Sequence, residues 1–441
     1  MKLPAYILFV VLCCFQWGYA QNKFRLPDHQ KSDKIKFKLI NNLIVLPVEV
    51  NGVDLSFLLD TGVAKPIVFG FFNEEDTLQI RNTEAFFLRG LGEGDAFEAL
   101  KSKNNTFKIG EAVSSNQDLY AIYDSSINFT PKLGVPIHGI IGYDLFKDFV
   151  VEINYSAKYI KLFDPEYYDY KACRDCETLN LEFYNNKPYL NLEVQVDGNF
   201  IPVKLLIDSG GSDALWLFEN KNLGLHANSE YFIDFLGHGL SGSVYGKRSK
   251  IDALKLKGFS FENVNVAYPD SSDVFMAKKF KDRNGSIAGN VLMRFNMIVD
   301  YRKAKLTLKR NRYFKKPFRY NMSGIELEHH GVQLVAESTM EFLRQISDNN
   351  IKIDFGSTPE YNMMVKPAFV IVELREDSPA KRVGLLVGDV VIKVNNRDAS
   401  SYKLQEIMEL FYGEEGEEIK MEVDRNGFES HYKFRLESPL K

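Results

Sequence analysis

The chain contains the same local pattern twice, and this repeat constrains the fold more than any other feature. Residues 45–69 and 190–218 each hold an alternating apolar segment, an Asn-Gly or Asp-Gly pair, and a second, more continuously apolar segment. Alternation around such a two-residue turn is typical of a β-hairpin. The second segment runs into Asp-Thr-Gly at residues 60–62 in one copy and into Asp-Ser-Gly at residues 208–210 in the other.

A second shared block lies further along each copy. Residues 139–163 and 286–309 both read as a buried strand that ends in Gly, a short helix and a hairpin. The glycine of this block follows the aspartate of the first pattern by 82 positions in one copy and by 81 in the other. These near-equal offsets predict two copies of one unit of about 140 residues.

The duplicated aspartates, Asp60 and Asp208, are the candidate catalytic residues. If the two copies pack about a pseudo-twofold axis, both carboxyls lie at the interface, where they cannot both ionise and share one proton. The neighbouring hydroxyls can brace the two loops, and the glycines let the backbone turn tightly beside the carboxyls. The residues expected to support the pair are Thr61, Gly62, Ser209 and Gly210.

These motifs resemble the aspartic proteases, both the bilobal pepsin type and the retropepsin type, over about residues 35–310. The resemblance implies a mainly β fold with two β-barrel lobes in one chain, and therefore a monomer. It also implies an endopeptidase that hydrolyses peptide bonds of a peptide or protein substrate with an activated water, without a metal or another cofactor. Val63 and Gly211 follow the two motifs, a pattern that is more similar to retropepsins than to pepsin.

Three other interpretations of the motifs stay open. The two aspartates could be turn residues at strand ends, or the pair could belong to a noncatalytic peptide-binding scaffold built on a protease fold. Asp208 and Ser209 also begin an Asp-Ser-Gly-Gly sequence that resembles the nucleophile of chymotrypsin-like serine proteases. That chemistry requires a histidine base, and none of the histidines lies in a sequence similar to that family's histidine loop.

Each copy has a glycine-spaced hairpin signal between its two shared blocks. Gly92 and Gly94 mark the first signal, and Gly237 and Gly239 mark the second. Glycine permits a close approach of the backbone to a ligand, so these four residues are candidates for two mobile flaps. Ordinary surface turns are the alternative.

The first twenty residues have the layout of a secretory signal peptide. Lys2 precedes an apolar run from Tyr6 to Phe15, and the small residues Gly18 and Ala20 precede Gln21. No later stretch is long and apolar enough for a transmembrane helix. The mature protein is expected to be exported, as a periplasmic or secreted extracellular protein, and Leu12 before Cys13 speaks against lipoprotein anchoring.

Removal of a signal peptide would leave two cysteines, Cys173 and Cys176. In an exported protein this pair can be a disulfide, a redox-active pair or half of a zinc site. The histidines show no spacing that would complete a zinc site, so a small disulfide is expected.

The charge of the chain gives no support for nucleic acid as a partner. It has 55 Lys and Arg residues against 59 Asp and Glu residues, a formal net charge of −4. Proteins that bind nucleic acid need a surplus of positive charge to face the phosphates. The hydrophobic fraction of 45% predicts a folded globular protein, and 441 residues predict about three domains.

The last third of the chain resembles a PDZ domain from about residue 324 to 438. The sequence Ser-Pro-Ala, followed by Gly-Leu and Gly-Asp at residues 378–389, carries the resemblance. It implies an α+β domain that binds a peptide ligand by strand addition beside a helix. The residues expected to line that groove are Phe369, Ile371, Leu404 and Ile407. Residues 337–359 are expected to be an insertion, partly helical.

The predicted organisation therefore has five segments. They are a signal peptide at 1–20, an N-terminal protease lobe at 21–170, a C-terminal protease lobe at 171–310, a linker at 311–323 and a PDZ-like domain at 324–441.

Overall fold

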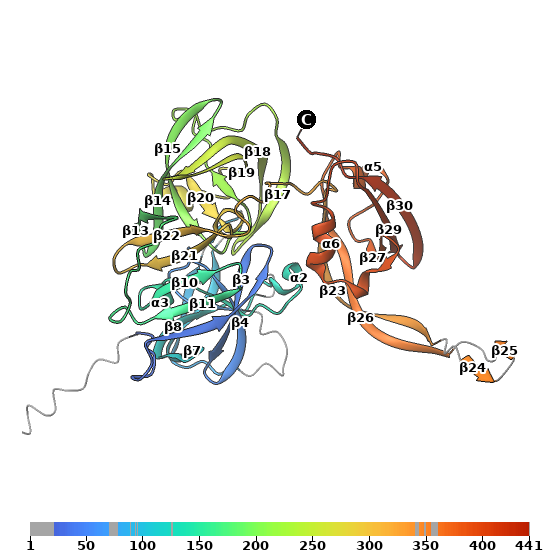
Figure 1. Ribbon diagram of the computed structural model, residues 1–441, viewed down its shortest axis with the longest axis horizontal. Helices are drawn as coiled ribbons and strands as arrows, with labels where there is room; N and C mark the ends of the chain where they lie inside the picture. The colour runs from blue at the N-terminus through green and yellow to red at the C-terminus, as the bar shows by residue number, and fades with distance from the viewer. Residues whose placement is uncertain are drawn as a thin grey trace, which may run out of the picture. The chain divides into compact units, whose positions relative to one another are not determined.

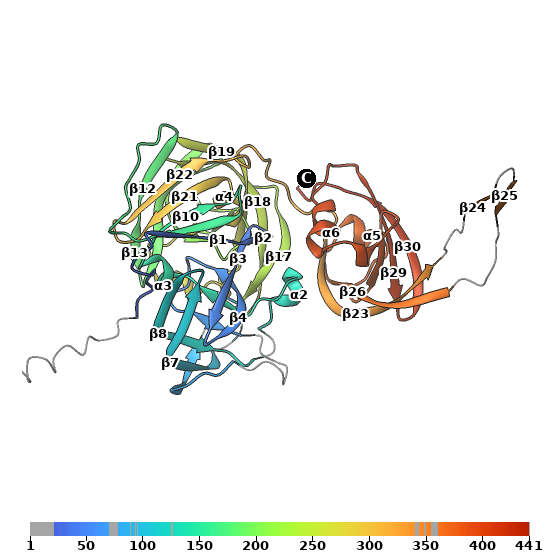
Figure 2. The same cartoon turned by 60° about the horizontal axis from the view of Figure 1, so that its bottom comes forward.

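The structure is a computed structural model that describes residues 22–69, 78–88, 90–92, 94, 96–124, 127–339, 344–347, 350–353 and 360–440. These residues form two compact units. The described residues before Pro131, Val135–Tyr320 and the described residues from Pro439 onward belong to the first unit, and Asn321–Ser438 with Pro131–Gly134 form the second. Figures 1 and 2 show that strands dominate each unit, so the fold is mainly β, as the sequence predicts.

The first half of the first unit is built on an eight-stranded sheet in the order β2-β3-β4-β9-β5-β8-β7-β6. Its strands are β2 (Lys38–Ile40), β3 (Leu43–Val50), β4 (Val53–Leu59), β5 (Ile67–Val68), β6 (Thr83–Leu88), β7 (Phe97–Ile109), β8 (Ala112–Ala121) and β9 (Gly139–Ile141). The short helix α3 (Tyr143–Phe146) follows β9 almost directly. The helix α2 (Thr130–Leu133) precedes β9 in the chain, and all of its residues except Thr130 belong to the second unit.

The second half contains a sheet with the same strand order, β13-β14-β15-β20-β16-β19-β18-β17. Its strands are β13 (Glu182–Tyr184), β14 (Lys187–Val196), β15 (Asn199–Asp208), β16 (Leu215–Leu217), β17 (Phe232–Gly239), β18 (Gly242–Leu256), β19 (Phe259–Pro269) and β20 (Gly285–Ala288). A 3-10 helix, η1 (Ala277–Lys279), precedes β20, and α4 (Gly289–Leu292) follows it. The two halves thus share one topology, strand for strand.

A third sheet joins the halves in the order β1-β11-β10-β21-β22-β12. Its strands are β1 (Ser32–Lys36), β10 (Val150–Asn154), β11 (Tyr159–Phe163), β12 (Cys176–Asn180), β21 (Phe295–Asp300) and β22 (Lys305–Arg310). The halves meet where β10 pairs antiparallel with β21, so that Glu152 lies opposite Ile298. Because three strands come from each half, the sheet fixes the two copies against each other symmetrically.

Both predicted hairpins are present, and their turn residues explain them. Asn51 and Gly52 join β3 to β4 with φ angles of 50° and 87°, and Asp197 and Gly198 join β14 to β15 with 49° and 78°. Such left-handed pairs match the twist of a two-residue hairpin, and Asn, Asp and Gly adopt them at low cost. Buried side chains of both halves then pack into one continuous apolar core.

The second unit has a mixed architecture. Its sheet has the order β23-β26-β27-β29-β30, with β28 paired to β27. The strands are β23 (Ile325–Thr339), β26 (Glu360–Leu374), β27 (Val390–Val394), β28 (Arg397–Asp398), β29 (Glu418–Arg425) and β30 (Phe428–Arg435). The helices are α5 (Pro379–Arg382), α6 (Leu404–Leu410) and the 3-10 helix η2 (Ala399–Ser401), and a separate hairpin has β24 (Arg344–Ser347) and β25 (Asn350–Ile353).

Two parts of the chain differ from expectation. The insertion at 337–359 was expected to be partly helical, but its described residues are the ends of β23 and the hairpin β24–β25. The segment expected as a linker packs against the first unit as far as Tyr320. The Tyr320 hydroxyl donates to the carbonyl of Ser249 (2.5 Å) and accepts from the amide of Val266 (3.1 Å). Buried polar groups with such partners order a segment.

The expected signal peptide, residues 1–20, lies outside the described residues. Within the described part of the chain, no helix has the length and apolar character needed to cross a membrane.

Candidate active site

Asp60 and Asp208 occupy equivalent positions at the ends of two strands. Asp60 follows β4 directly, and Asp208 is the last residue of β15. The parallel neighbours of these strands are β9 and β20, and the Asp60 amide donates to the carbonyl of Ile141 at the end of β9 (2.8 Å). The fold thus presents each carboxyl from the end of a strand whose edges are both paired.

Four hydrogen bonds join the loop of Asp60 to the loop of Asp208. The Thr61 hydroxyl donates to the carbonyl of Ile207 (2.7 Å) and accepts from the amide of Ser209 (3.0 Å). The Ser209 hydroxyl donates to the carbonyl of Leu59 (2.7 Å) and accepts from the amide of Thr61 (3.0 Å). Thr61 and Ser209 are 3% and 1% exposed, so these bonds are shielded from water and fix the loops together.

The glycines of both motifs stand against the carboxyls. A Cβ atom on Gly210 would lie 2.5 and 2.9 Å from the two carboxyl oxygens of Asp60, across the boundary between the halves. A Cβ on Gly62 would lie 3.0 Å from Oδ1 of Asp60 and 3.8 Å from Oδ1 of Asp208. The two carboxyls therefore face the same small space, and only glycine leaves room for them. The Gly62 amide also donates to Asp60 (2.6 Å).

The environment raises the pKa of both carboxyls above the ordinary value of an aspartate. For Asp60 the first cause is desolvation by burial and the second is the charge of Asp208, while amide donors and the charge of Lys187 oppose the shift. For Asp208 desolvation is again first, and the charges of Arg283 and Lys187 and the amides of Gly210 and Gly211 oppose it. Burial and mutual repulsion thus favour a pair that keeps one proton.

Sequence reasoning missed two cations beside the pair, Lys187 and Arg283. Both belong to the second half, where Lys187 begins β14 and Arg283 precedes β20. The sequence does contain a signal for Lys187. Both copies have an Asn-Asn pair, and the residue that follows the pair is Leu43 in the first copy and Lys187 in the second.

The two hairpins that carry the predicted flap glycines meet at their tips. The Ser241 amide donates to the carbonyl of Leu91 (2.9 Å), and the Gly94 amide donates to the carbonyl of Ser241 (2.7 Å). A Cβ atom on Gly239 would collide with the carbonyl of Leu91, so the close approach requires glycine. Gly92 and Gly237 have φ angles of 116° and 144°, which L residues rarely adopt. A role as mobile flaps stays a prediction.

Ser209 is not arranged as a nucleophile. Its hydroxyl is used by the backbone contacts to Leu59 and Thr61, and no hydrogen bond joins it to a histidine among the described residues. A serine nucleophile needs a histidine base within hydrogen-bond reach. The geometry therefore disfavours the serine protease interpretation.

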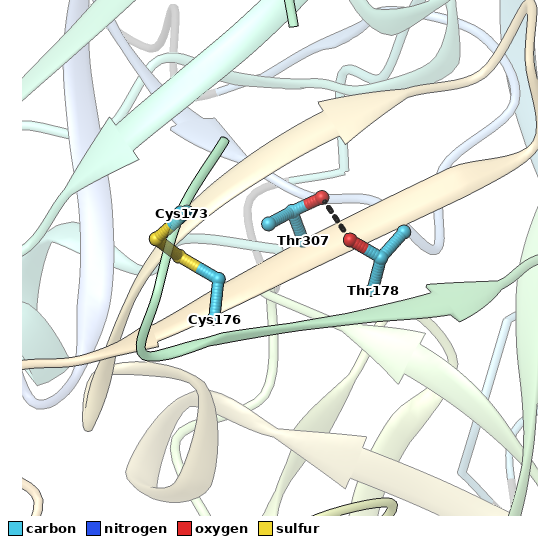
Figure 3. The surroundings of a disulfide bond; sticks show 4 residues. All are labelled: Cys173, Cys176, Thr178 and Thr307. Carbon is cyan, nitrogen blue, oxygen red and sulfur yellow. Dashed lines mark hydrogen bonds between the residues drawn. A yellow bond between two sulfur atoms is a disulfide. The ribbon is translucent and has the colours of Figure 1, made fainter. Parts of the chain in front are cut away.

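Cys173 forms a disulfide bond with Cys176, the first residue of β12, as Figure 3 shows. The same strand carries Thr178, whose hydroxyl lies 2.9 Å from that of Thr307 on β22. The bond closes a loop of only a few residues at the edge of the joining sheet. Within the described residues, no group of three or more His, Cys, Asp or Glu side chains could hold a metal ion.

The residues predicted to line the groove of the second unit are buried instead. Phe369, Ile371, Leu404 and Ile407 are at most 3% exposed and belong to the core of this unit. Phe369 and Ile371 lie on β26, which pairs with β23 on one side and with β27 on the other. An added peptide strand needs an unpaired edge, so the assignment of the groove strand to β26 is wrong. The edge strand is β23, and α6 packs against it.

The first unit defines a class of protein: two halves of equal topology, each contributing one aspartate to a hydrogen-bonded pair of loops. The comparisons with known families agree with it. Residues 46–145 match the family described as aspartyl protease, and residues 370–425 match the family described as PDZ domain. The chain therefore carries an aspartyl protease domain and a C-terminal PDZ domain, which supports a peptidase with a PDZ module. The protease match includes Asp60 and ends before the second half. No curated protein matches the chain.

Proposed function

We propose that the protein is an exported aspartic endopeptidase in which Asp60 and Asp208 share one proton and activate a water molecule. The observation that carries this proposal is the set of four hydrogen bonds through Thr61 and Ser209, which ties the two aspartate loops together. A pair of turn residues without a joint role would not need this reciprocal brace.

The chemistry follows from the shared proton. The ionised carboxyl takes a proton from the water, whose oxygen attacks the carbonyl carbon of the scissile peptide bond. The protonated carboxyl gives its proton to the carbonyl oxygen, which forms a tetrahedral intermediate. The carboxyl that took the water's proton then donates it to the leaving nitrogen, while the other carboxylate takes a proton from a hydroxyl of the tetrahedral intermediate. The C–N bond breaks as the product carboxyl group forms, and the pair returns to its starting state with one proton. The raised pKa of both carboxyls supports this scheme, because the pair then retains a proton to donate.

Replacement of either aspartate tests the function. Asp60→Asn and Asp208→Asn should each lower kcat/KM on denatured casein or quenched fluorescent peptides by at least about 100-fold, since one carboxyl cannot be both acid and base. Asp54→Asn, at an exposed position of β4, is the matched control and should keep activity. Circular dichroism verifies that each variant is folded.

The outcome separates the endopeptidase from the noncatalytic peptide-binding scaffold. A scaffold would bind peptides without cleaving them, and Asp60→Asn would leave that binding intact. A kcat/KM of Asp60→Asn equal to that of the wild type would contradict the shared-proton mechanism.

Export is part of the proposal and has its own test. The signal-like layout of residues 1–20 and the disulfide of Cys173 and Cys176 support it, because disulfides persist in oxidising compartments. N-terminal sequencing of the protein recovered from its expressing cells should begin at Gln21. Recovery of the intact N-terminus from the cytoplasmic fraction would refute export.

A further inference from the structure

The sheet face that carries each aspartate has a different chemistry in the two halves. Equivalent residues can be assigned from strand pairing, counting back from each aspartate. Val45 pairs with Leu58, two residues before Asp60, and Tyr189 pairs with Leu206, two residues before Asp208. Because side chains alternate along a strand, residues two positions apart lie on the same face.

In the first half this row is aliphatic. Leu58 pairs onward with Ile140 of β9, and Ile140 pairs with Ile67 of β5. Val45, Leu58, Ile140 and Ile67 therefore form one apolar row beside Asp60. Two further equivalent positions, Leu43 and Ile137, are also buried and apolar.

In the second half three of the four corresponding positions carry a polar group, and only Leu206 is aliphatic. Leu206 pairs onward with Ser286 of β20, and Ser286 pairs with Trp216 of β16. Tyr189 replaces Val45, Ser286 replaces Ile140 and Trp216 replaces Ile67. A Cβ on Gly62 would lie 3.6 Å from the Leu206 side chain, so this row reaches toward the loop of the other half.

Arg283 lies across this polar row. Its Nη2 donates to the hydroxyl of Ser286 (2.7 Å), and its Nε donates to the carbonyl of Gly285 (3.1 Å). The equivalent position in the first half is Ile137, since Gly285 and Gly139 pair with equivalent residues. The guanidinium is thus held in place, and its charge acts on Asp208.

Lys187 lies on the same sheet face as Asp208, and its charge acts on both aspartates. Tyr189 lies opposite Leu206, so the register extended by two residues sets Lys187 opposite Asp208, on the same face. Within the described residues, Lys187 Nζ makes no hydrogen bond or ion pair, and burial lowers the pKa of this lysine. Its ammonium group therefore has donors available to a ligand.

The charges of the aspartate pair, Lys187 and Arg283 do not balance, and one negative charge is missing. A pair of aspartates with one shared proton carries one negative charge, whereas Lys187 and Arg283 carry two positive charges. One positive charge is left over in a partly buried site, where unbalanced charge is costly. A carboxylate from a substrate would balance it, and the same carboxylate beside the aliphatic row of the first half would lose its hydration without compensation.

We propose that the second half of the site binds an acidic side chain of the substrate next to the scissile peptide bond, with Lys187 as its ion-pair partner and Arg283 as the second positive charge. This inference rests on the proposed function, because it assumes that a peptide lies at the aspartate pair. It names the substrate class: peptides with an Asp or Glu on one side of the cleaved bond.

The test measures binding, so that it does not depend on cleavage. The probes are two pairs of peptides in which a hydroxyethylene unit replaces the scissile amide and Glu or Gln either follows or precedes that unit. Calorimetry with the full chain from Gln21 gives the Glu-to-Gln affinity ratio of each pair. In one pair the wild type should favour Glu by roughly 10- to 100-fold, the effect of one charge-assisted hydrogen bond.

Variants of Lys187 assign the preference to this residue. Lys187→Met should bring the ratio of that pair to about 1, Lys187→Glu should reverse it, and Lys187→Arg should retain it. Lys221→Met, at an exposed position of the same half, is the matched control and should keep the wild-type ratio. A wild type without preference in both pairs, or a preference unchanged in Lys187→Met, overturns the proposal.

Cleavage assays on the matching amide peptides keep the two proposals distinct. Preferential binding of the Glu probe without cleavage of any amide would support the acidic subsite and contradict the endopeptidase. Cleavage of the amide peptides by a protein that binds the Glu and Gln probes equally would support the endopeptidase and contradict the acidic subsite.

Discussion

The hydroxyl brace between the aspartate loops leads to a quantitative prediction about stability. Thr61→Val keeps the shape of the side chain and removes the hydroxyl. The carbonyl of Ile207 and the amide of Ser209 then lose their hydrogen-bond partner. Water cannot easily replace it, because Thr61 and Ser209 are at most 3% exposed. A buried polar group left without a partner costs about 1–3 kcal/mol, so two of them should lower the free energy of unfolding by about 2–6 kcal/mol. Ser209→Ala should have a similar effect, through the carbonyl of Leu59 and the amide of Thr61.

Urea unfolding of the chain from Gln21 measures this change. Trp216 is its only tryptophan and lies on β16 in the second half, so its fluorescence follows the unfolding of the unit that contains the brace. The matched control is Thr178→Val, which removes one member of an exposed hydroxyl pair on the joining sheet and should cost less than about 0.5 kcal/mol. If Thr61→Val changes the unfolding free energy no more than Thr178→Val does, the brace does not stabilise the site as argued.

Two other predictions concern buried charge. Since the folded-state pKa of Asp60 is raised, the folded wild type is most stable with respect to this group below the ordinary aspartate pKa and loses stability as pH rises toward the folded-state pKa. The unfolding free energy of Asp60→Asn relative to wild type should therefore increase from about pH 4 to pH 7, and a constant difference over this range would contradict the raised pKa. In the second unit, Arg425 forms two bonds of 2.6 and 2.7 Å with Asp389, which is 1% exposed. Asp389→Ala should destabilise that unit by roughly 2–3 kcal/mol because Arg425 loses its partner, and amide exchange that stays as slow as in wild type over residues 390–425 would argue against it.

Much of the first unit could be predicted because its signals are local. Asn-Gly and Asp-Gly turns fix the two hairpins, and the position of each aspartate after an apolar strand places both carboxyls at equivalent strand ends. The repeat of these signals then identifies two halves. The sequence also supplied the hydroxyls of Thr61 and Ser209, although the exact donors and acceptors depend on how the halves meet.

The parts that escaped prediction depend on contacts between distant segments. The tip contact between Leu91 and Ser241 joins residues 150 positions apart, and no local pattern signals it. The edge of the sheet in the second unit could not be read from residue types either, because β23 and β26 are both long apolar-containing strands and only their pairing shows which one is free on one side. Lys187 and Arg283 escaped prediction because they occupy positions at which the two copies differ, and a repeat identifies only the positions that the copies share.

The joining sheet also shows how far the fold of the first unit depends on the covalent link between its halves. The pairing of β10 with β21 is a backbone contact that does not involve the connecting segment, residues 164–175. The peptide link between the halves then acts mainly as a tether that raises their effective concentration, rather than as part of the structure that holds the two aspartates together. The two halves should consequently be separable into two polypeptides that reassemble, a property that would allow each half-site to be changed independently.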